Sequence, residues 1–160
     1  MLLSYRHATL PVNEGLLLHA VMHGGLFIDA ANCANPYKLM GIVEEQDLAR
    51  VFVMNAEAIY RFRDTLREVR YWLQQKSCNR LYVSTVGALF SYDDEYENKR
   101  VLAHCYELLA TLALDYEVIV ARDKHYGHLL PPHEELIDYG THGYESKASF
   151  RTDYAGTHRL

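Results

Sequence analysis

Three groups of side chains in this chain have types and spacing that suit chemistry. The first is Asp29, Asn32 and Asn35, which follow an apolar run and precede Pro36. Open α/β sheets place ligands where a strand ends and a helix begins, so these residues form a candidate ligand pocket. The alternative, which we prefer, is that Asp29 and Asn35 cap the turn and the helix, because Asx side chains commonly accept backbone N–H groups.

The second group is the polar segment after the apolar run 117–121. Its candidate nucleic-acid contacts are Arg122, Lys124, His125, Tyr126 and His128. The cations suit phosphate and the tyrosine ring suits an unpaired base, whereas the spacing His125-x-x-His128 would suit a metal ion. No third ligand of clear identity accompanies the two histidines, so we assign no metal site. An exposed loop is the simplest interpretation.

The third group is His104 and Cys105, whose imidazole and thiol could form a nucleophilic pair. They fall inside a predicted helix, where residues i and i+1 do not face each other. We therefore expect a packed cysteine beside a histidine at the surface. No catalytic residue is assigned anywhere in the chain.

The composition is that of one globular domain spanning residues 1–160. The apolar fraction is 49%, and the formal net charge of −5 opposes strong binding to nucleic acid. The three cysteines form no CxxC pair, which fits reduced thiols and a cytoplasmic protein. No apolar run approaches ~18 residues, so we expect no membrane partner.

Alternating apolar runs and helical patterns predict the elements that must position these groups. We expect a leader over 1–14 and strands over 15–20, 25–29, 51–54, 81–86 and 117–121, with helices over 36–46, 56–76 and 98–114. Only about four residues separate the first two strands, too few for a crossover helix. Either these strands are not parallel neighbours or a helix has been lost.

The carboxyl-terminal part is predicted to differ from the core, which spans about 15–121. Residues 136–139 suit a helical turn, and 143–160 suit an antiparallel edge hairpin that turns near Asp153–Gly156. The predicted fold is therefore α/β: a three-layer α/β/α arrangement with a mostly parallel sheet and a terminal hairpin. We expect the strands near 26–29, 51–54, 81–85 and 117–121 to be parallel and central in the sheet.

Five sequence blocks, in order, resemble the RecA/RadA family of recombinase-type ATPases. The matching blocks are FIDAA (27–31), NPYKL (35–39), VFVMNA (51–56), LYVST (81–85) and VIVARD (118–123). They resemble, respectively, the family's [Y/F]-I-D-T-E strand, its x-P-E-R-[L/I] helix start, its R-A-[F/Y]-N block, its Walker B strand and its V-I-V-T-N-Q strand. The resemblance implies a RecA-like sheet and places a DNA-contacting loop after residue 121.

The same comparison shows which catalytic parts differ. No G-x-x-x-x-G-K-[ST] phosphate loop occurs, and the short link over 20–25 would fit deletion of that loop and its helix. The family's catalytic Glu falls on Ala31, its Walker B Asp on Ser84, and its γ-phosphate-sensing Gln on Asp123. The resemblance therefore implies a degenerate, truncated paralogue that does not hydrolyse ATP and uses no cofactor.

These observations favour a catalytically inactive binding protein in DNA recombination or repair. Its partner would be an active recombinase paralogue or a second copy of itself, with weak contact to nucleic acid. In that case Asp29, Asn32, Asn35 and Ser84 would mark a residual ligand pocket. The alternatives are an enzyme with a remodelled nucleotide- or metal-dependent site, and a structural module that forms homo-oligomers.

Overall fold

A computed structural model describes residues 1–7, 11–90, 94–122 and 135–139. Its strands are β1 (Leu2–His7), β2 (Gly25–Asp29), β3 (Val51–Asn55), β4 (Arg80–Val83), β5 (Glu117–Ala121) and β6 (Glu135–Tyr139). They form one six-stranded sheet in the order β3-β2-β4-β5-β1-β6, and every pair of neighbours is parallel.

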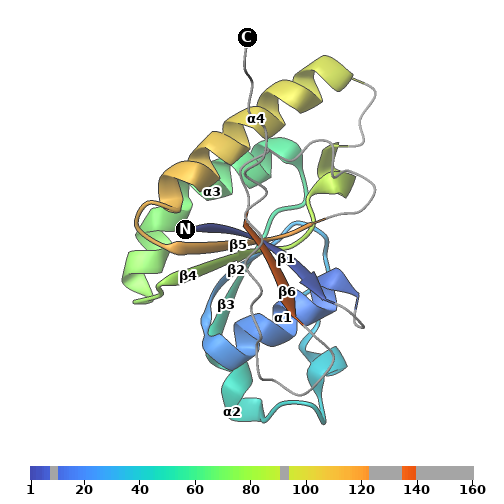
Figure 1. The fold of residues 1–160 in the computed structure, drawn as a ribbon, viewed down its shortest axis with the longest axis vertical. Helices are drawn as coiled ribbons and strands as arrows, with labels where there is room; N and C mark the ends of the chain where they lie inside the picture. The colour runs from blue at the N-terminus through green and yellow to red at the C-terminus, as the bar shows by residue number, and fades with distance from the viewer. Residues whose placement is uncertain (8–10, 91–93, 123–134, 140–160) are drawn as a thin grey trace, which may run out of the picture.

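Helices lie on both faces of this sheet (Figure 1). One face carries α1 (Val12–His23), the 3₁₀ turn η1 (Pro36–Leu39) and the short α2 (Glu45–Leu48). The other carries α3 (Ile59–Gln75), the 3₁₀ turn η2 (Gly87–Phe90) and α4 (Glu95–Leu112). The α/β class is confirmed, and the arrangement agrees with the predicted order of helix, sheet and helix.

The central strands are apolar on both faces because each face is covered by helices. In β2, Leu26 and Ile28 pack with α3 and α4, whereas Phe27 packs with α1. All three side chains are buried. The period of two along the strand thus separates two cores, one on each side of the sheet.

Most of the predicted core elements are confirmed with shifted ends. The strands at 25–29 and 117–121 have the predicted bounds, and those at 51–54 and 81–86 become Val51–Asn55 and Arg80–Val83. The helix predicted over 56–76 is Ile59–Gln75, and that predicted over 98–114 is Glu95–Leu112. The latter begins earlier because the side chain of Asp94 caps it, accepting a hydrogen bond from the amide of Glu97 at 2.9 Å.

The prediction for the amino-terminal part was wrong. Residues 2–7 form β1 instead of a leader, and the run 15–20 belongs to α1 instead of a strand. Apart from His19, the run is apolar because α1 is covered by the sheet on one side and approached by α2 on another. No helix has been lost before β2, because α1 is itself the crossover from β1 to β2.

Three further predictions need correction. The helix predicted over 36–46 is instead the 3₁₀ turn Pro36–Leu39 and the separate short helix Glu45–Leu48. The segment 136–139, predicted as a helical turn, is part of β6, because it pairs in parallel with β1. The strand Val51–Asn55 was predicted to be central, but it lies at an edge of the sheet. The hairpin predicted over 143–160 lies outside the described residues.

Candidate functional site

The sheet has a topological switch point between β2 and β4. These two strands are neighbours, but the chain leaves β2 toward β3 on one side and leaves β4 toward β5 on the other. The connections also run on opposite faces, through α2 and α4 respectively (Figure 1). Ligands of open α/β sheets bind at such a point, beyond the carboxyl ends of the strands.

Asp29 closes β2 at this point, and its carboxylate is buried. Oδ1 accepts a hydrogen bond from the amide of Cys33 at 2.9 Å, and Oδ2 accepts one from the amide of Ala34 at 2.8 Å. The thiol of Cys33 also donates to Oδ1 at 3.2 Å. The carboxylate thus folds the loop after β2 back over the end of its own strand.

Ser84 follows β4 and holds the same loop from the neighbouring strand. Its Oγ accepts hydrogen bonds from the amides of Ala30 at 2.8 Å and Ala31 at 3.0 Å. The Ser84 hydroxyl also donates to Oδ1 of Asp29 at 3.4 Å. Two of the predicted pocket residues, Asp29 and Ser84, therefore meet, and both are occupied by the protein's own backbone.

The other two predicted pocket residues lie at the surface. Asn32 is exposed and has a φ of 51°, in the left-handed region that asparagine tolerates better than most residues. Asn35 is also exposed, and its side chain accepts the amide of Tyr37 at 3.0 Å as the cap of η1. This local geometry agrees with the capping interpretation that we preferred from the sequence for Asp29 and Asn35.

Cys33 is a member of this site that sequence reasoning missed. Burial, followed by its hydrogen bond to Asp29, raises the pKa of the thiol to about 12. At neutral pH the thiol is protonated, so it acts as a donor to the carboxylate and is a poor nucleophile. Its position four residues after a strand-ending aspartate was the only signal in the sequence.

A second missed contact joins α1 to the end of β4. The Asn13 side chain accepts the amide of Thr85 at 2.9 Å and donates to its hydroxyl at 2.8 Å. Asn13 lies in the first turn of α1, so this pair fixes the start of that helix beside the switch point. This contact was not predicted from the sequence, because Asn13 was expected to lie in a leader and not in a helix.

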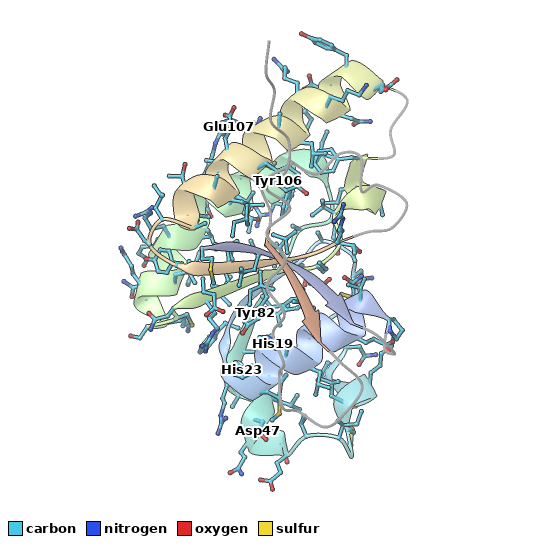
Figure 2. All side chains as sticks on the ribbon, viewed as in Figure 1. His19, His23, Asp47, Tyr82, Tyr106 and Glu107 are labelled. Atoms are coloured by element: carbon cyan, nitrogen blue, oxygen red, sulfur yellow. The ribbon has the colours of Figure 1, made fainter. Side chains whose placement is uncertain are left out.

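A histidine pair lies on the α1 side of the sheet, near Arg80 at the start of β4 and away from the carboxyl ends of the strands. Figure 2 shows His19 and His23 on α1 beside Tyr82 of β4. The ring centroids of His19 and His23 are 4.3 Å apart. Burial, the charge of His23 and the charge of Arg80 lower the pKa of His19 to about 3. Burial and Arg80 also lower the pKa of His23. The imidazole of His19 is therefore neutral at physiological pH.

His104 and Cys105 do not form a catalytic pair. Cys105 is fully buried, and burial raises the pKa of its thiol to about 12. His104 lies at the surface, where its ring approaches Arg67 at 3.4 Å and Glu107 at 3.6 Å. The expectation of a packed cysteine beside a surface histidine is confirmed.

Of the predicted nucleic-acid contacts, only Arg122 lies within the described residues. Arg122 is exposed directly after β5, at the same edge of the sheet as Asp29 and Ser84. Lys124, His125, Tyr126 and His128 lie outside the described residues. Among the residues that are described, no group of three or more His, Cys, Asp or Glu side chains could hold a metal ion.

Neither the scan against protein-family models nor the search of curated proteins finds a match to this chain. Within the described residues, no helix has the length and apolar character needed to cross a membrane.

Proposed function

We propose that this chain is a RecA-like domain that has lost ATP hydrolysis and acts by binding, as an accessory or regulator of an active recombinase in DNA recombination or repair. Of the five sequence blocks that carry the resemblance, four fall on β2, β3, β4 and β5 in order, and NPYKL falls on the 3₁₀ turn η1. Those strands are parallel members of one sheet, and β2 and β4 meet at its switch point. This arrangement supports the proposal.

The observation that carries the proposal is the role of Ser84. A RecA-type site needs an aspartate at this position, where its carboxylate helps to hold the Mg²⁺ ion. Here a hydroxyl takes its place and accepts the amides of Ala30 and Ala31. Ala31, in turn, stands where the resemblance places the water-activating glutamate. Both catalytic carboxylates are thus replaced, and the Ser84 hydroxyl is hydrogen-bonded to the amides of the loop after β2.

The connection between β1 and α1 supports the same conclusion. Phosphate loops lie between a strand and the helix that follows it, where glycine amides and a lysine surround the phosphates. The segment between His7 and Val12 reads Ala-Thr-Leu-Pro and contains neither glycine nor lysine. This chain therefore lacks the residues that hold β- and γ-phosphates, at the place in the fold where they would stand.

The alternative of an enzyme with a remodelled site has less support. Its best candidates at the switch point are Asp29 and Cys33, but the carboxylate is bound to loop amides and the thiol is protonated. A general base or nucleophile must be able to reach a substrate in the reactive protonation state. Neither group meets that requirement.

The test is nucleotide binding and ATP turnover, with and without Mg²⁺, for the native protein and a Ser84→Asp/Ala31→Glu double variant. We expect no turnover from either, because restoring two carboxylates does not restore the amides and lysine that hold the phosphates. A heat-treated sample is the control. Turnover above that control by either protein would contradict the proposal.

The binding role is tested separately by co-sedimentation with the purified active recombinase of the same cell. We expect a complex that forms without nucleotide bound to this chain. Failure to bind the recombinase, with or without DNA, would remove the accessory role even if no ATP turnover is found.

A further inference from the structure

The outer edge of β3 has backbone groups that the described part of the chain leaves unpaired. Within the described residues, β3 pairs with β2 and forms no second ladder. The amide of Gly25 donates to the carbonyl of Arg50 at 3.1 Å, and the amide of Ala56 donates to the carbonyl of Asp29 at 3.0 Å. The even-numbered residues of β3 therefore direct their backbone N–H and C=O groups toward β2. Val51, Val53 and Asn55 direct theirs outward.

This edge lacks the features by which proteins usually prevent pairing between sheets. Those features are proline, charged side chains in the strand, and bulges. The sequence of β3 is Val-Phe-Val-Met-Asn, and its register with β2 is unbroken from Val51 to Asn55. Phe52 is 36% exposed and Val53 is 46% exposed, so the edge is apolar as well as accessible.

We propose that β3 is a homodimer interface, in which two copies pair their β3 strands antiparallel about a two-fold axis at Val53. This register places Val53 opposite Val53 of the second copy, and Val51 opposite Asn55. It pairs all of the outward-facing backbone groups of the strand with their counterparts. Axes at Phe52 or Met54 would leave an outward residue of the strand without a partner.

The side chains in this register are complementary. Phe52 lies opposite Met54 of the second copy on the face that carries α3, where Lys76 already stacks on the Phe52 ring at 4.6 Å. On the opposite face, the β-branched Val53 meets its own copy, a favourable cross-strand pair. The dimer would join the two sheets into one continuous sheet.

The charges at the ends of β3 favour a second copy aligned in this way. Arg50 precedes the strand and Glu57 follows Ala56 after it, and both side chains are exposed. In the antiparallel register, Arg50 lies opposite Ala56 of the second copy and next to Glu57. Opposite charges therefore meet at both ends of the interface, which favours this orientation over a parallel one. The inference depends on the sheet edge and not on the function proposed above.

The test uses the proposed register, in which residue 53 of one copy lies opposite residue 53 of the second copy. Val53→Lys and Val53→Glu each place like charges opposite one another, so we expect each variant alone to weaken dimerisation on the order of a hundredfold. An equimolar mixture of the two places opposite charges together and is expected to restore the dimer. Sedimentation velocity of the full chain over a range of concentrations gives the dissociation constants.

Two control variants accompany the test, and circular dichroism checks that every variant is folded. Val53→Thr keeps a β-branched side chain and Tyr71→Lys adds a charge on α3, and both are expected to dimerise as the native protein does. A native chain that is monomeric, or single charge variants that dimerise normally, would overturn the proposal. A Lys/Glu mixture that stays monomeric would overturn the register, and with it the two-fold axis at Val53.

Discussion

His19 is the residue that links the packing of α1 most directly to pH. Its ring lies between His23 and Tyr82, and its pKa is lowered to about 3. In the unfolded chain the same imidazole titrates near 6.5. Because the folded state binds its proton less readily, the stabilisation from keeping His19 neutral is complete above pH 6.5 and decreases as the pH falls below that value.

We therefore expect the protein to lose about 1.4 kcal/mol of unfolding free energy between pH 7.5 and pH 5.5 through this group. Urea denaturation at the two pH values measures the loss, and a His19→Gln variant provides the comparison. The variant should show a flatter dependence on pH over that interval. Identical pH profiles for the native protein and the variant would show that another group is responsible.

At the level of single residues, part of the switch-point site was located from the sequence. Asp29 was identified because it ends an apolar strand, and Ser84 because the resemblance places the family's Walker B aspartate there. The partners of their side chains are backbone amides of Ala30, Ala31, Cys33 and Ala34. Every residue carries such an amide, so no residue type in the sequence marks it as a hydrogen-bond partner.

Among the elements, predictions succeeded where a periodic pattern met a clear end signal. The helix α3 is amphipathic, and β2 and β5 are short apolar runs with turns at their ends. The helix α1 was mistaken for a strand because its buried residues surround most of the helix, and a continuous apolar run has no diagnostic period. Strands β1 and β6 were missed because β1 is defined by its pairing with β5 and β6, and β6 by its pairing with β1, and not by their own residues.

Gly25, at the start of β2, gives a prediction about how closely β2 packs against β4. Gly25 has a φ of +146°, and a Cβ there would lie 2.8 Å from the carbonyl of Arg80 and 2.8 Å from the ring of Tyr82. We expect Gly25→Ala to destabilise the protein by about 3 kcal/mol or more, because strain and overpacking add. Chemical denaturation measures the change.

Gly41→Ala is the matched control for this experiment. Gly41 also has a positive φ, +83°, but no atom lies within 4 Å of the added Cβ. Its cost should be limited to the conformational strain, about 1 kcal/mol. Equal losses for the two variants would show that crowding against β4 does not matter.

For the molecule as a whole, the net charge of −5 sets the expectation for nucleic acid. We predict weak, salt-sensitive binding to single-stranded DNA, or none, centred on the segment Arg122–His128. Any binding should strengthen as the pH falls through about 6.5, because protonated histidines add positive charge. Fluorescence anisotropy with a labelled oligonucleotide at low salt tests this prediction.

The comparison is with an Arg122→Ala/Lys124→Ala/Tyr126→Ala triple variant, which removes the cations and the stacking ring. Equal binding by the native and triple-variant proteins would exclude this segment as the contact. Affinity that increased with salt would exclude an electrostatic origin altogether.

The strand order has a consequence for how the chain is made. β1, which precedes the other five strands in the sequence, lies between β5 and β6, with Leu2 aligned to Val118 and Leu3 aligned to Glu135. During synthesis β1 therefore has no neighbour until β5 (Glu117–Ala121) has been translated, although β2, β3 and β4 can already assemble. Contacts between such distant segments slow folding, and a strand that waits for its partners is open to aggregation. Completion of the sheet is thus a late event that joins the two ends of the chain.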